Sequence, residues 1–447
     1  MFLNLHKNIK KEELIMSKIP KVVVIGGGWA GCAAAASARK AGAKVDLIER
    51  TDMLLGTGLV GGIFRNNGRY TAAEEMSNLG SDFFKLLDNN IMHKNVEFPG
   101  HHHASLYKVW IMESIVKEYL SDLGVNIIMR CRIDDISRNE NRIVTVMSKK
   151  TNKVIEGDVF IDTTGTSAIP ANCTKYGNGC AMCIQRCHSF GARVDLLSKA
   201  GIEYWDAKRA DGSVGAMSGS CKLAKESLNS DIVDELEKKG CALVPVPADV
   251  KEDISLLGKK ACQQYAIKDY IDNLVLLDTG PVKLMTPFFP LENLRRIPGM
   301  EKARYEDPLA GGKGNSMRYF GFANCEETLR AIGKVNNLFC AGEKSGAMVG
   351  HTEAIVTGFL AGHNAVRYAI GEKLLELPES LSVGDFVNST IKKMKKPEGR
   401  IYKYTFSGSI YFERMKEKNL YSINDKEIAE RVKKTGLVDI FNKKLVV

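Results

Sequence analysis

Three glycines at fixed spacing and an acidic residue form the first group in the chain that could bind a cofactor. Gly26, Gly28 and Gly31 make a G-x-G-x-x-G motif, and Glu49 follows after a second apolar run. In a strand–turn–helix unit the first glycine permits a tight turn, the second lets the backbone approach a pyrophosphate, and the third lets helix and strand pack closely. A carboxylate about 20 residues on accepts hydrogen bonds from ribose hydroxyls. We therefore predict a dinucleotide site, which also includes Trp29, Ala30 and Arg50.

Two later segments separate FAD from NAD as the cofactor. Residues 158–165 are an apolar run that ends in Thr-Thr-Gly, and residues 337–343 are another that ends in Ala-Gly-Glu. Each alone is better explained as a buried strand before a turn. In this order, however, they resemble the second and last flavin fingerprints of the two-dinucleotide-binding flavoproteins. The resemblance adds these predicted FAD contacts: Gly165, Gly342, Glu343, Gly350 and Thr352.

Four cysteines lie close together in the sequence and suggest a metal or redox centre. Cys173, Cys180, Cys183 and Cys187 fall within 15 residues, and the last three follow a C-x-x-C-x-x-x-C spacing that is typical of bacterial ferredoxins. We favour a [4Fe–4S] cluster that relays electrons to or from the flavin. Structural zinc held by four thiolates is one alternative. A redox dithiol formed by Cys180 and Cys183 is another.

No catalytic acid or base is identified securely by these patterns. Glu343, Lys344, His351 and Arg65 are candidates because we expect them near the flavin ring. The glycine-rich run 56–62, with the arginines that follow it, suits either a loop along the pyrophosphate or substrate, or a domain seam. His101-His102-His103 suggests a plain surface loop, or else a loop that touches substrate or flavin, rather than a metal site, because adjacent histidines point in different directions.

The helices and strands that must position these residues are predicted from the periodicity of apolar residues and from residues such as glycine that end helices. Residues 21–25 and 44–48 read as buried parallel strands, with an alanine-rich helix between them that ends at Gly42. Helical stretches are expected near 72–87 and 105–123, and a helix from about Thr352 to Ala369. Short strands are expected near 125–129, 134–137, 142–147 and 153–156.

This order predicts an α/β chain: a Rossmann-like FAD-binding domain of the two-dinucleotide-binding type, with an inserted α+β substrate or cap domain and a helical C-terminal tail. We expect FAD-binding parts at 17–170 and 326–375. The cap domain is placed at 171–325 and the helical extension at 376–447. Residues 1–16 are expected to be disordered or untranslated, with Met16 as the true start.

Composition limits the cellular compartments and the partners that we expect for the protein. The 447 residues are 44% hydrophobic and 26% charged, with no apolar run long enough for a membrane span and no signal peptide. Eleven cysteines without an export signal favour a cytoplasmic protein over a disulfide scaffold. The net charge of +10 permits RNA or an acidic ferredoxin-type carrier as partner, although a lysine-rich solvated surface explains it more simply.

The motifs together, and above all LFCAGEKSGAMVGHTEAIVTGFLAGHNAVRYAIGE, resemble the glucose-inhibited-division type flavoproteins. Among these the chain is similar to the folate- and FAD-dependent tRNA uridine methyltransferases. It is similar over most of its length to a group of FAD-dependent oxidoreductases of anaerobes, which share GTGLVGGIFRNNGRYTAAEEM, the DTTGT turn and YGNGCAMC.

Two differences from the methyltransferases limit what the resemblance implies. Their Cys-Leu-Pro-Ile-Glu motif has Phe288 in place of its cysteine here, and no cysteine occurs between Cys32 and Cys131, where their second cysteine motif lies. The sequence therefore favours an FAD-dependent oxidoreductase with a cluster relay and a small-molecule or thiol substrate. Its alternatives are a flavin-dependent RNA-modifying enzyme and a non-catalytic FAD-bearing RNA-binding or redox-sensing protein.

Overall fold

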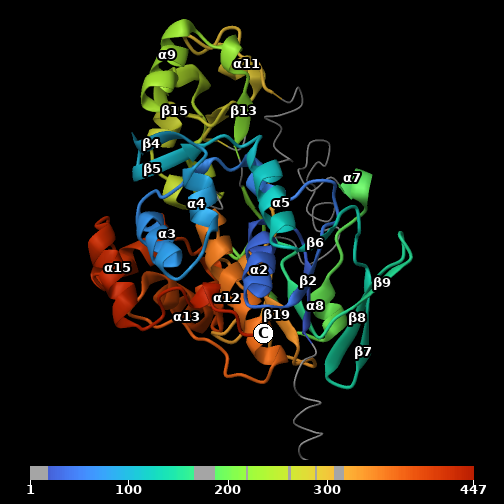
Figure 1. The fold of residues 1–447 in the computed structure, drawn as a ribbon. Helices are drawn as coiled ribbons and strands as arrows, with labels where there is room; N and C mark the ends of the chain where they lie inside the picture. The colour runs from blue at the N-terminus through green and yellow to red at the C-terminus, as the bar shows by residue number, and fades with distance from the viewer. Residues whose placement is uncertain are drawn as a thin grey trace, which may run out of the picture.

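A parallel five-stranded sheet lies at the centre of the lower body of the molecule (Figure 1). The computed structural model describes residues 19–165, 187–217, 220–259, 263–286, 289–306 and 317–446. The strand order is β19-β10-β1-β2-β6. The strands are β1 (Lys21–Ile25), β2 (Lys44–Ile48), β6 (Asn126–Ile128), β10 (Val159–Asp162) and β19 (Leu338–Cys340).

The sheet is buried on both faces, which explains its continuous apolar strands. Val24 pairs with Leu47 on one side and Ile161 on the other, and all three are fully buried. Parallel sheets of this kind need helices on their faces. The predicted Rossmann-like α/β fold class is confirmed, and the first two strands have the predicted bounds.

Helices α2 (Trp29–Lys40) and α12 (His351–Ala369) pack against each other with their backbones close together. A Cβ at Gly358 would lie 2.4 Å from the carbonyl oxygen of Ala30, and one at Gly362 would lie 2.2 Å from that of Ala34. Ser37 Oγ also donates to the carbonyl oxygen of Phe359 at 2.7 Å. Small residues on both helices therefore bring the first and last nucleotide-binding segments together.

An antiparallel excursion precedes β10, as predicted. Its strands are β7 (Asp135–Asn139), β8 (Arg142–Ser148) and β9 (Lys153–Glu156). The prediction of a helix over 105–123 is wrong for the first third of that range. Residues 101–107 form strand β5, and the helix α5 runs only over Met112–Asp122. The apolar residues at 104, 106 and 107 face two different cores, so they follow neither a pure helical nor a pure alternating pattern.

The histidine triplet is also different from its prediction as a surface loop. His101 begins β5, is fully buried, and stacks against Phe98 with ring centroids 4.8 Å apart. Strand β5 (His101–Tyr107) pairs with β4 (Ile91–Phe98) and β3 (Ile63–Phe64). The preceding helices are α3 (Gly68–Asn78) and α4 (Phe83–Asp88).

An upper lobe rises above β4 and β5 and has its own core (Figure 1). Its four-stranded antiparallel sheet has the order β13-β16-β15-β14. The back of this sheet packs on β4 and β5 through Val96, Leu106 and Leu277. The lobe consists of β13 (Cys221–Leu223), α9 (Ser230–Lys239), β14 (Cys241–Pro245), α10 (Asp269–Asp272), β15 (Asn273–Asp278), β16 (Val282–Leu284) and α11 (Leu291–Leu294).

Short elements connect the lobe to the main body. They are α7 (Cys187–Phe190), α8 (Leu196–Ala200), β11 (Tyr204–Asp206), β12 (Ala216–Met217), β17 (Met317–Arg318) and β18 (Gly321–Ala323). Strand β11 pairs antiparallel with β18, and β12 with β17. No helix among the described ranges has the length and apolar character needed to cross a bilayer.

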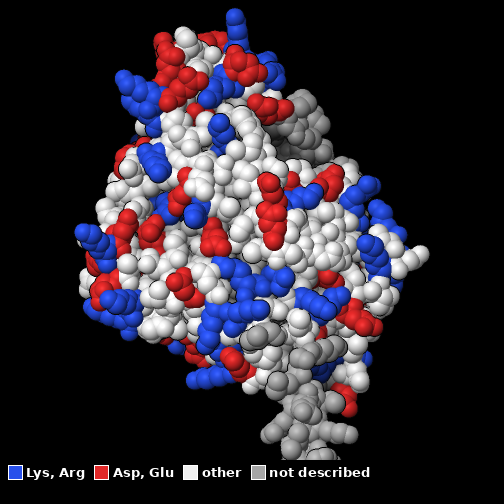
Figure 2. All heavy atoms as spheres, in the orientation of Figure 1, with Lys and Arg blue, Asp and Glu red and all other residues white. Residues whose placement is uncertain are grey.

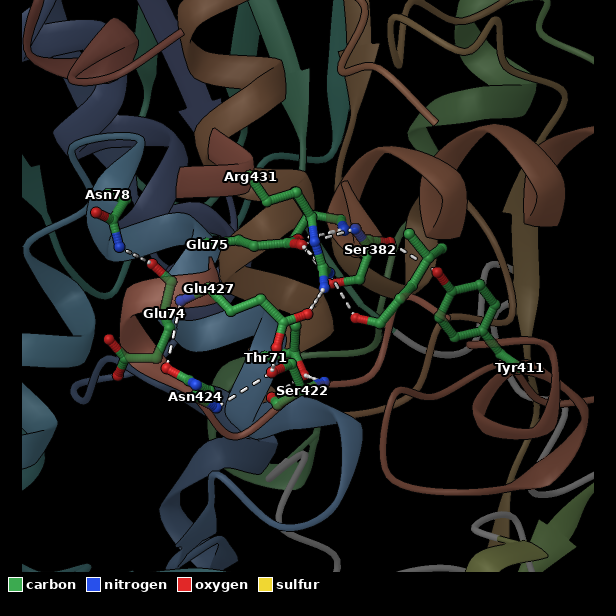
Figure 3. A network of polar contacts seen from close by, with 12 residues as sticks. Thr71, Glu74, Glu75, Asn78, Ser382, Tyr411, Ser422, Asn424, Glu427 and Arg431 are labelled. Carbon is green, nitrogen blue, oxygen red and sulfur yellow. Dashed lines mark hydrogen bonds and ion pairs between the residues drawn. The ribbon is translucent and has the colours of Figure 1, made fainter. Parts of the chain in front are cut away.

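The C-terminal helices wrap around α3, at the lower left of Figure 1. They are α13 (Ser382–Met394), α14 (Ser409–Glu417) and α15 (Asp425–Lys434). Glu75 of α3 is fully buried and accepts hydrogen bonds from the amides of Ser382 and Val383 and from the Ser382 hydroxyl, at 2.6 to 3.0 Å. Arg431 Nη1 lies 3.3 Å from the same carboxylate (Figure 3). We call Glu75, Ser382, Val383 and Arg431 the C-terminal clamp.

Candidate functional site

The first and third glycines of the motif leave no room for a side chain where β1 enters α2. Gly26 has φ +106° and donates to the carbonyl oxygen of Ile48 at 2.8 Å. A Cβ at Gly31 would lie 1.8 Å from the carbonyl oxygen of Gly26. Any larger residue at position 31 would separate helix from strand, so the third glycine of the motif is required for packing.

Gly28 lies in a different environment from its neighbours. It precedes α2 in an extended conformation, and an added Cβ would have no described atom within 4 Å. The free amides at the start of α2 and the helix dipole favour an anion at this point. Open space beside a glycine at a helix N-terminus is the arrangement that a pyrophosphate requires.

Glu49 ends β2 and is held in place by backbone amides. Its Oε2 accepts from the amide of Gly27 at 2.7 Å, and its Oε1 accepts from the amide of Thr51 at 2.7 Å. A carboxylate has about four acceptor sites, so two remain for the hydroxyls of a ribose. Arg50 points away toward the carbonyl oxygen of Gly191, with its Nη1 2.6 Å from that oxygen.

The ends of β10 and β19 complete the same edge of the sheet. Asp162 Oδ1 accepts from the amide and hydroxyl of Thr164, while Oδ2 is buried with no hydrogen-bond partner among the described residues. Gly165 has φ +76°, and an added Cβ there would have no atom of the described residues within 4 Å. Gly342 begins the turn after β19, and its amide donates to Thr357 Oγ1 at 2.8 Å.

Helix α12 directs its N-terminus toward this edge. Gly350 caps it with φ +142°, and Thr352 Oγ1 is buried without a partner in the described part of the chain. Open positions at Gly28 and Gly165 and unpaired polar atoms at Asp162 and Thr352 fit a bound FAD. We call this set of turns the cofactor cradle. The individual FAD contacts predicted from sequence stay predictions.

The loop 56–62 brings polar groups to the start of α12. A Cβ at Gly61 would lie 1.9 Å from Cε1 of His351, and Tyr107 Oη lies 3.3 Å from His351 Nδ1. Burial raises the pKa of Tyr107, so its hydroxyl stays protonated. His351 was a candidate from sequence, whereas Tyr107 was not, because it was assigned to a predicted helix.

A buried ion pair supports the same helix start from below. Glu353 Oε1 accepts from Arg69 Nε at 3.1 Å, from Thr405 Oγ1 at 2.7 Å and from the amide of Phe406 at 2.9 Å. Arg69 Nη1 donates to Asn66 Oδ1, and Asn66 in turn contacts His101 Nδ1 at 2.9 Å. This network links α12 to β5.

His101 is electrically neutral within that network. Burial lowers its pKa to about 3, and the charge of Arg69 adds to the shift. A neutral ring that accepts a hydrogen bond from Asn66 at Nδ1 carries its proton on Nε2. No sequence signal identified this network, because its members are spread over positions 66 to 406.

The comparison with protein families decides the membership of the chain. Residues 21–266 and 285–373 match the model of the family described as Glucose inhibited division protein A. The chain belongs to this family. The resemblance seen in the sequence is thereby confirmed, and FAD as the cofactor is supported by the family and by the fit of the cradle.

The curated relatives are similar in sequence to only part of this chain. The methylenetetrahydrofolate–tRNA-(uracil-5-)-methyltransferase TrmFO of Bacillus pumilus is 33% identical over 112 residues, which is 24% of each chain. That of Streptococcus sanguinis is 36% identical over 89 residues, 20% of this chain and 19% of the relative. The chain thus matches about a quarter or less of their length.

Solved structures of GidA share the fold over almost all of this chain. GidA of Aquifex aeolicus superposes with a TM-score of 0.65 at 17% identity, covering 96% of this chain and 75% of that one. A second crystal form of the same protein gives a TM-score of 0.64 at 16% identity. The likeness establishes the Rossmann-like FAD-binding architecture.

The remaining candidates from sequence lie in contrasting surroundings. Lys344 is fully buried, and burial lowers its pKa although the carboxylates of Asp162 and Asp195 oppose the shift. Arg65 is bound by its own ion pairs with Glu74 and Asp88, the latter at 2.7 Å. Arg65 therefore acts first as a structural cation of α3 and α4. Glu343 is the middle residue of the short turn 342–344 that follows β19.

The four-cysteine group lies outside the described residues. Cys173, Cys180 and Cys183 fall in the gap at 166–186, and of Cys187 only the backbone is described. Within the described ranges no group of three or more His, Cys, Asp or Glu side chains could hold a metal ion. Phe288 also lies outside them. The predicted [4Fe–4S] cluster has no support from the fold or from the comparisons.

Proposed function

We propose that the protein is an FAD-dependent enzyme that modifies tRNA. The observation that carries the proposal is membership of the Glucose inhibited division protein A family together with an intact cofactor cradle. The partial likeness to tRNA uracil methyltransferases supports tRNA as the substrate class. This reading replaces the small-molecule oxidoreductase that the sequence alone favoured.

Each part of the cofactor cradle has a role in this proposal. The α2 N-terminus and Gly28 would hold the pyrophosphate, and Glu49 the ribose. FAD supplies two-electron redox chemistry when bound. His351 and Tyr107, at 3.3 Å from each other, would hold a proton beside the start of α12. The loop 59–61 and α12 would exclude water from that point.

Positive charge on the surface supports an RNA partner. Lys443 and Lys444 are exposed next to the end of α2, because the amides of Leu445 and Val446 donate to the carbonyl oxygen of Ala41. Figure 2 shows Lys and Arg gathered across the lower middle of this face, where Figure 1 draws α2 and the C-terminal segment. A positively charged face of this kind attracts the phosphate backbone of a nucleic acid.

The proposal excludes a thiol-dependent methyl transfer. The cysteines that the resemblance assigns to that reaction are replaced here: Phe288 occupies one motif, and the stretch from Cys32 to Cys131 contains none between its ends. FAD-dependent redox chemistry on an RNA base is therefore the reaction class that we propose.

Nucleoside analysis tests this function directly. We expect tRNA from a strain lacking the gene to lose one modified nucleoside in mass spectrometry, and the purified FAD-loaded protein with a reductant to restore it. Affinity for unmodified tRNA should fall steeply with salt, and Lys443→Ala with Lys444→Ala should reduce that salt dependence. Unchanged nucleosides together with salt-independent binding would reject the proposal.

A second candidate function is carried by the spacing of Cys180, Cys183 and Cys187. In this candidate a [4Fe–4S] cluster on these residues and Cys173 exchanges electrons between FAD and a ferredoxin-type carrier. Anaerobic purification should then give about four irons and four acid-labile sulfides per chain. Zinc in their place would indicate a structural site, and neither metal would leave the Cys180–Cys183 dithiol.

A further inference from the structure

Two lysines of the upper lobe lie directly opposite each other in neighbouring strands. The antiparallel register of β13 and β16 pairs Lys222 with Lys283. Residues paired in this way point to the same face of the sheet, and like charges there destabilise it. We call Lys222 and Lys283 the lysine pair. Their placement alone would cost stability, and each ammonium group instead finds hydrogen-bond acceptors outside the sheet.

Both side chains reach across to the loop beside the cofactor cradle. Lys222 Nζ donates to the carbonyl oxygen of Leu59 at 3.0 Å. Lys283 Nζ donates to those of Val60 and Gly61 at 2.5 and 2.7 Å. The lysine pair therefore directs two positive charges at three consecutive residues of one loop.

The lysine pair is largely shielded from bulk water, with Lys283 buried and Lys222 half-buried. Lys283 is 8% exposed, and burial lowers the pKa of Lys222 against the opposing charge of Glu306. Charges are rarely buried in proteins without a functional or pairing reason. Their field also extends further in such surroundings, because it is screened less than at the surface.

The other side of this loop meets the start of α12. Gly61 lies against His351, and Tyr107 lies against both. The lysine pair, the loop 59–61 and the N-terminus of α12 thus form consecutive layers. The helix dipole at that terminus is also positive. The whole arrangement would favour negative charge on a flavin ring bound beside this helix terminus.

We propose that the lysine pair positions the loop 59–61 and raises the affinity of bound FAD for electrons and for added anions. Reduction of FAD by two electrons and one proton leaves one negative charge on the ring, which nearby cations stabilise. Addition of sulfite to oxidised FAD likewise gives an anionic adduct. The inference rests on FAD binding in the proposed function, but not on tRNA as substrate.

The test uses the full FAD-loaded protein without RNA. Lys222→Met and Lys283→Met remove one charge each and keep side-chain length, and Lys283→Arg keeps the charge. Lys239→Met on exposed α9 of the same lobe is the control. Each variant is reduced anaerobically with dithionite against a reference dye, and its affinity for sulfite is measured by flavin absorbance.

We expect each Met variant of the lysine pair to lower the ratio of reduced to oxidised FAD about tenfold at a fixed potential, or about 30 mV for two electrons. Sulfite affinity should fall by a similar factor. Lys283→Arg and Lys239→Met should leave both unchanged.

An unchanged ratio in the Met variants with full FAD content would overturn the proposal. So would equal loss of FAD in Lys283→Met and Lys283→Arg, since that result would make the lysine a structural latch alone. Should Lys283→Met fail to fold, Lys222→Met decides, because that side chain donates one hydrogen bond to the loop rather than two. If the unmutated protein does not modify tRNA but the Met variants shift the FAD ratio as expected, the proposed function fails and this inference stands.

Discussion

The cofactor cradle and the C-terminal clamp both join segments that are distant in the sequence, but they do so in opposite ways. In the cradle, residues without side chains bring backbones together, as at Gly31 against Gly26. In the clamp, one buried carboxylate on α3 collects donors from α13 and α15. The cradle leaves open space at Gly28, where a ligand can bind. In the clamp the carboxylate of Glu75 is fully buried among its donors. Binding sites and structural joints are therefore distinguished by what a side chain would meet there.

The sharpest test of the comparison uses two glycines of one motif. Gly31→Ala places a Cβ against a backbone oxygen, so we expect loss of FAD and about 3 kcal/mol or more of lost stability. Gly28→Ala meets no described atom, so it should leave the apoprotein stable while weakening FAD at least about 100-fold, or about 2.7 kcal/mol. Thermal unfolding and flavin fluorescence measure the two effects.

Equal destabilisation of the apoprotein by both glycine variants would contradict this distinction. It would mean that the space beside Gly28 belongs to the packing of the turn rather than to a ligand. Normal FAD content in Gly28→Ala would contradict it as well, because a cradle that tolerates a methyl group there does not hold the pyrophosphate at that point.

The clamp should be broken by removing its acceptor. Glu75→Ala leaves two buried amides without their acceptor and removes the buried carboxylate beside Arg431, and we expect a loss of about 3–5 kcal/mol in the free energy of unfolding by urea. Glu427→Ala is the matched control, because its carboxylate also meets Arg431 but is 56% exposed. A control effect above about 1 kcal/mol would show that Arg431, rather than Glu75, organises the joint.

A neighbouring carboxylate makes the C-terminal helices sensitive to acid. Burial alone would raise the pKa of Asp385, but hydrogen bonds from Arg414 and Lys418 outweigh it and hold the pKa below its ordinary value of 3.8. Its stabilising contribution is therefore full above that value and is lost as pH falls through the lower folded-state pKa.

Asp385→Asn should accordingly cost about 2 kcal/mol at pH 7 and flatten the loss of stability below pH 4. Unfolding curves at pH 7 and at several values below 4 measure both effects. A variant that follows the acid curve of the parent protein would assign the acid sensitivity to another carboxylate.

The smallest effect is expected on the surface. Lys392 and Glu379 form an ion pair at 2.9 Å, with side chains 58% and 43% exposed. Lys392→Ala should change the unfolding free energy by no more than about 0.5 kcal/mol, and less in high salt. A larger loss that persists in salt would show that the aliphatic part of Lys392 packs against a neighbouring segment.

Much of the cradle could be predicted from sequence because its physical requirements restrict residue type. A turn such as that at Gly26 needs φ above zero, and buried parallel strands need unbroken apolar runs, so both are visible in one chain. The helix α12 was predicted within one residue of its start at His351. Family membership and fold class followed from the same features.

Side-chain networks could not be predicted in this way. Glu353 and Thr405 pair with Arg69 across more than 280 residues, and nothing at any one position indicates the others. Residues 105–107 were assigned to a helix because apolar side chains that face two cores imitate helical spacing. The lysine pair was missed for the same reason, since only the register of β13 and β16 brings it together.

The order of strands in the parallel sheet affects how the protein is made. Strand β10 is flanked by β1 and β19, and Phe160 pairs with Leu338, which is synthesised 178 residues later. At about 5–20 residues per second, the apolar edge of β10 waits roughly 9 to 36 seconds for its neighbour. During that interval it is a template for wrong pairing with other chains. The nascent chain should therefore depend on chaperones until α12 has emerged and closed the cradle.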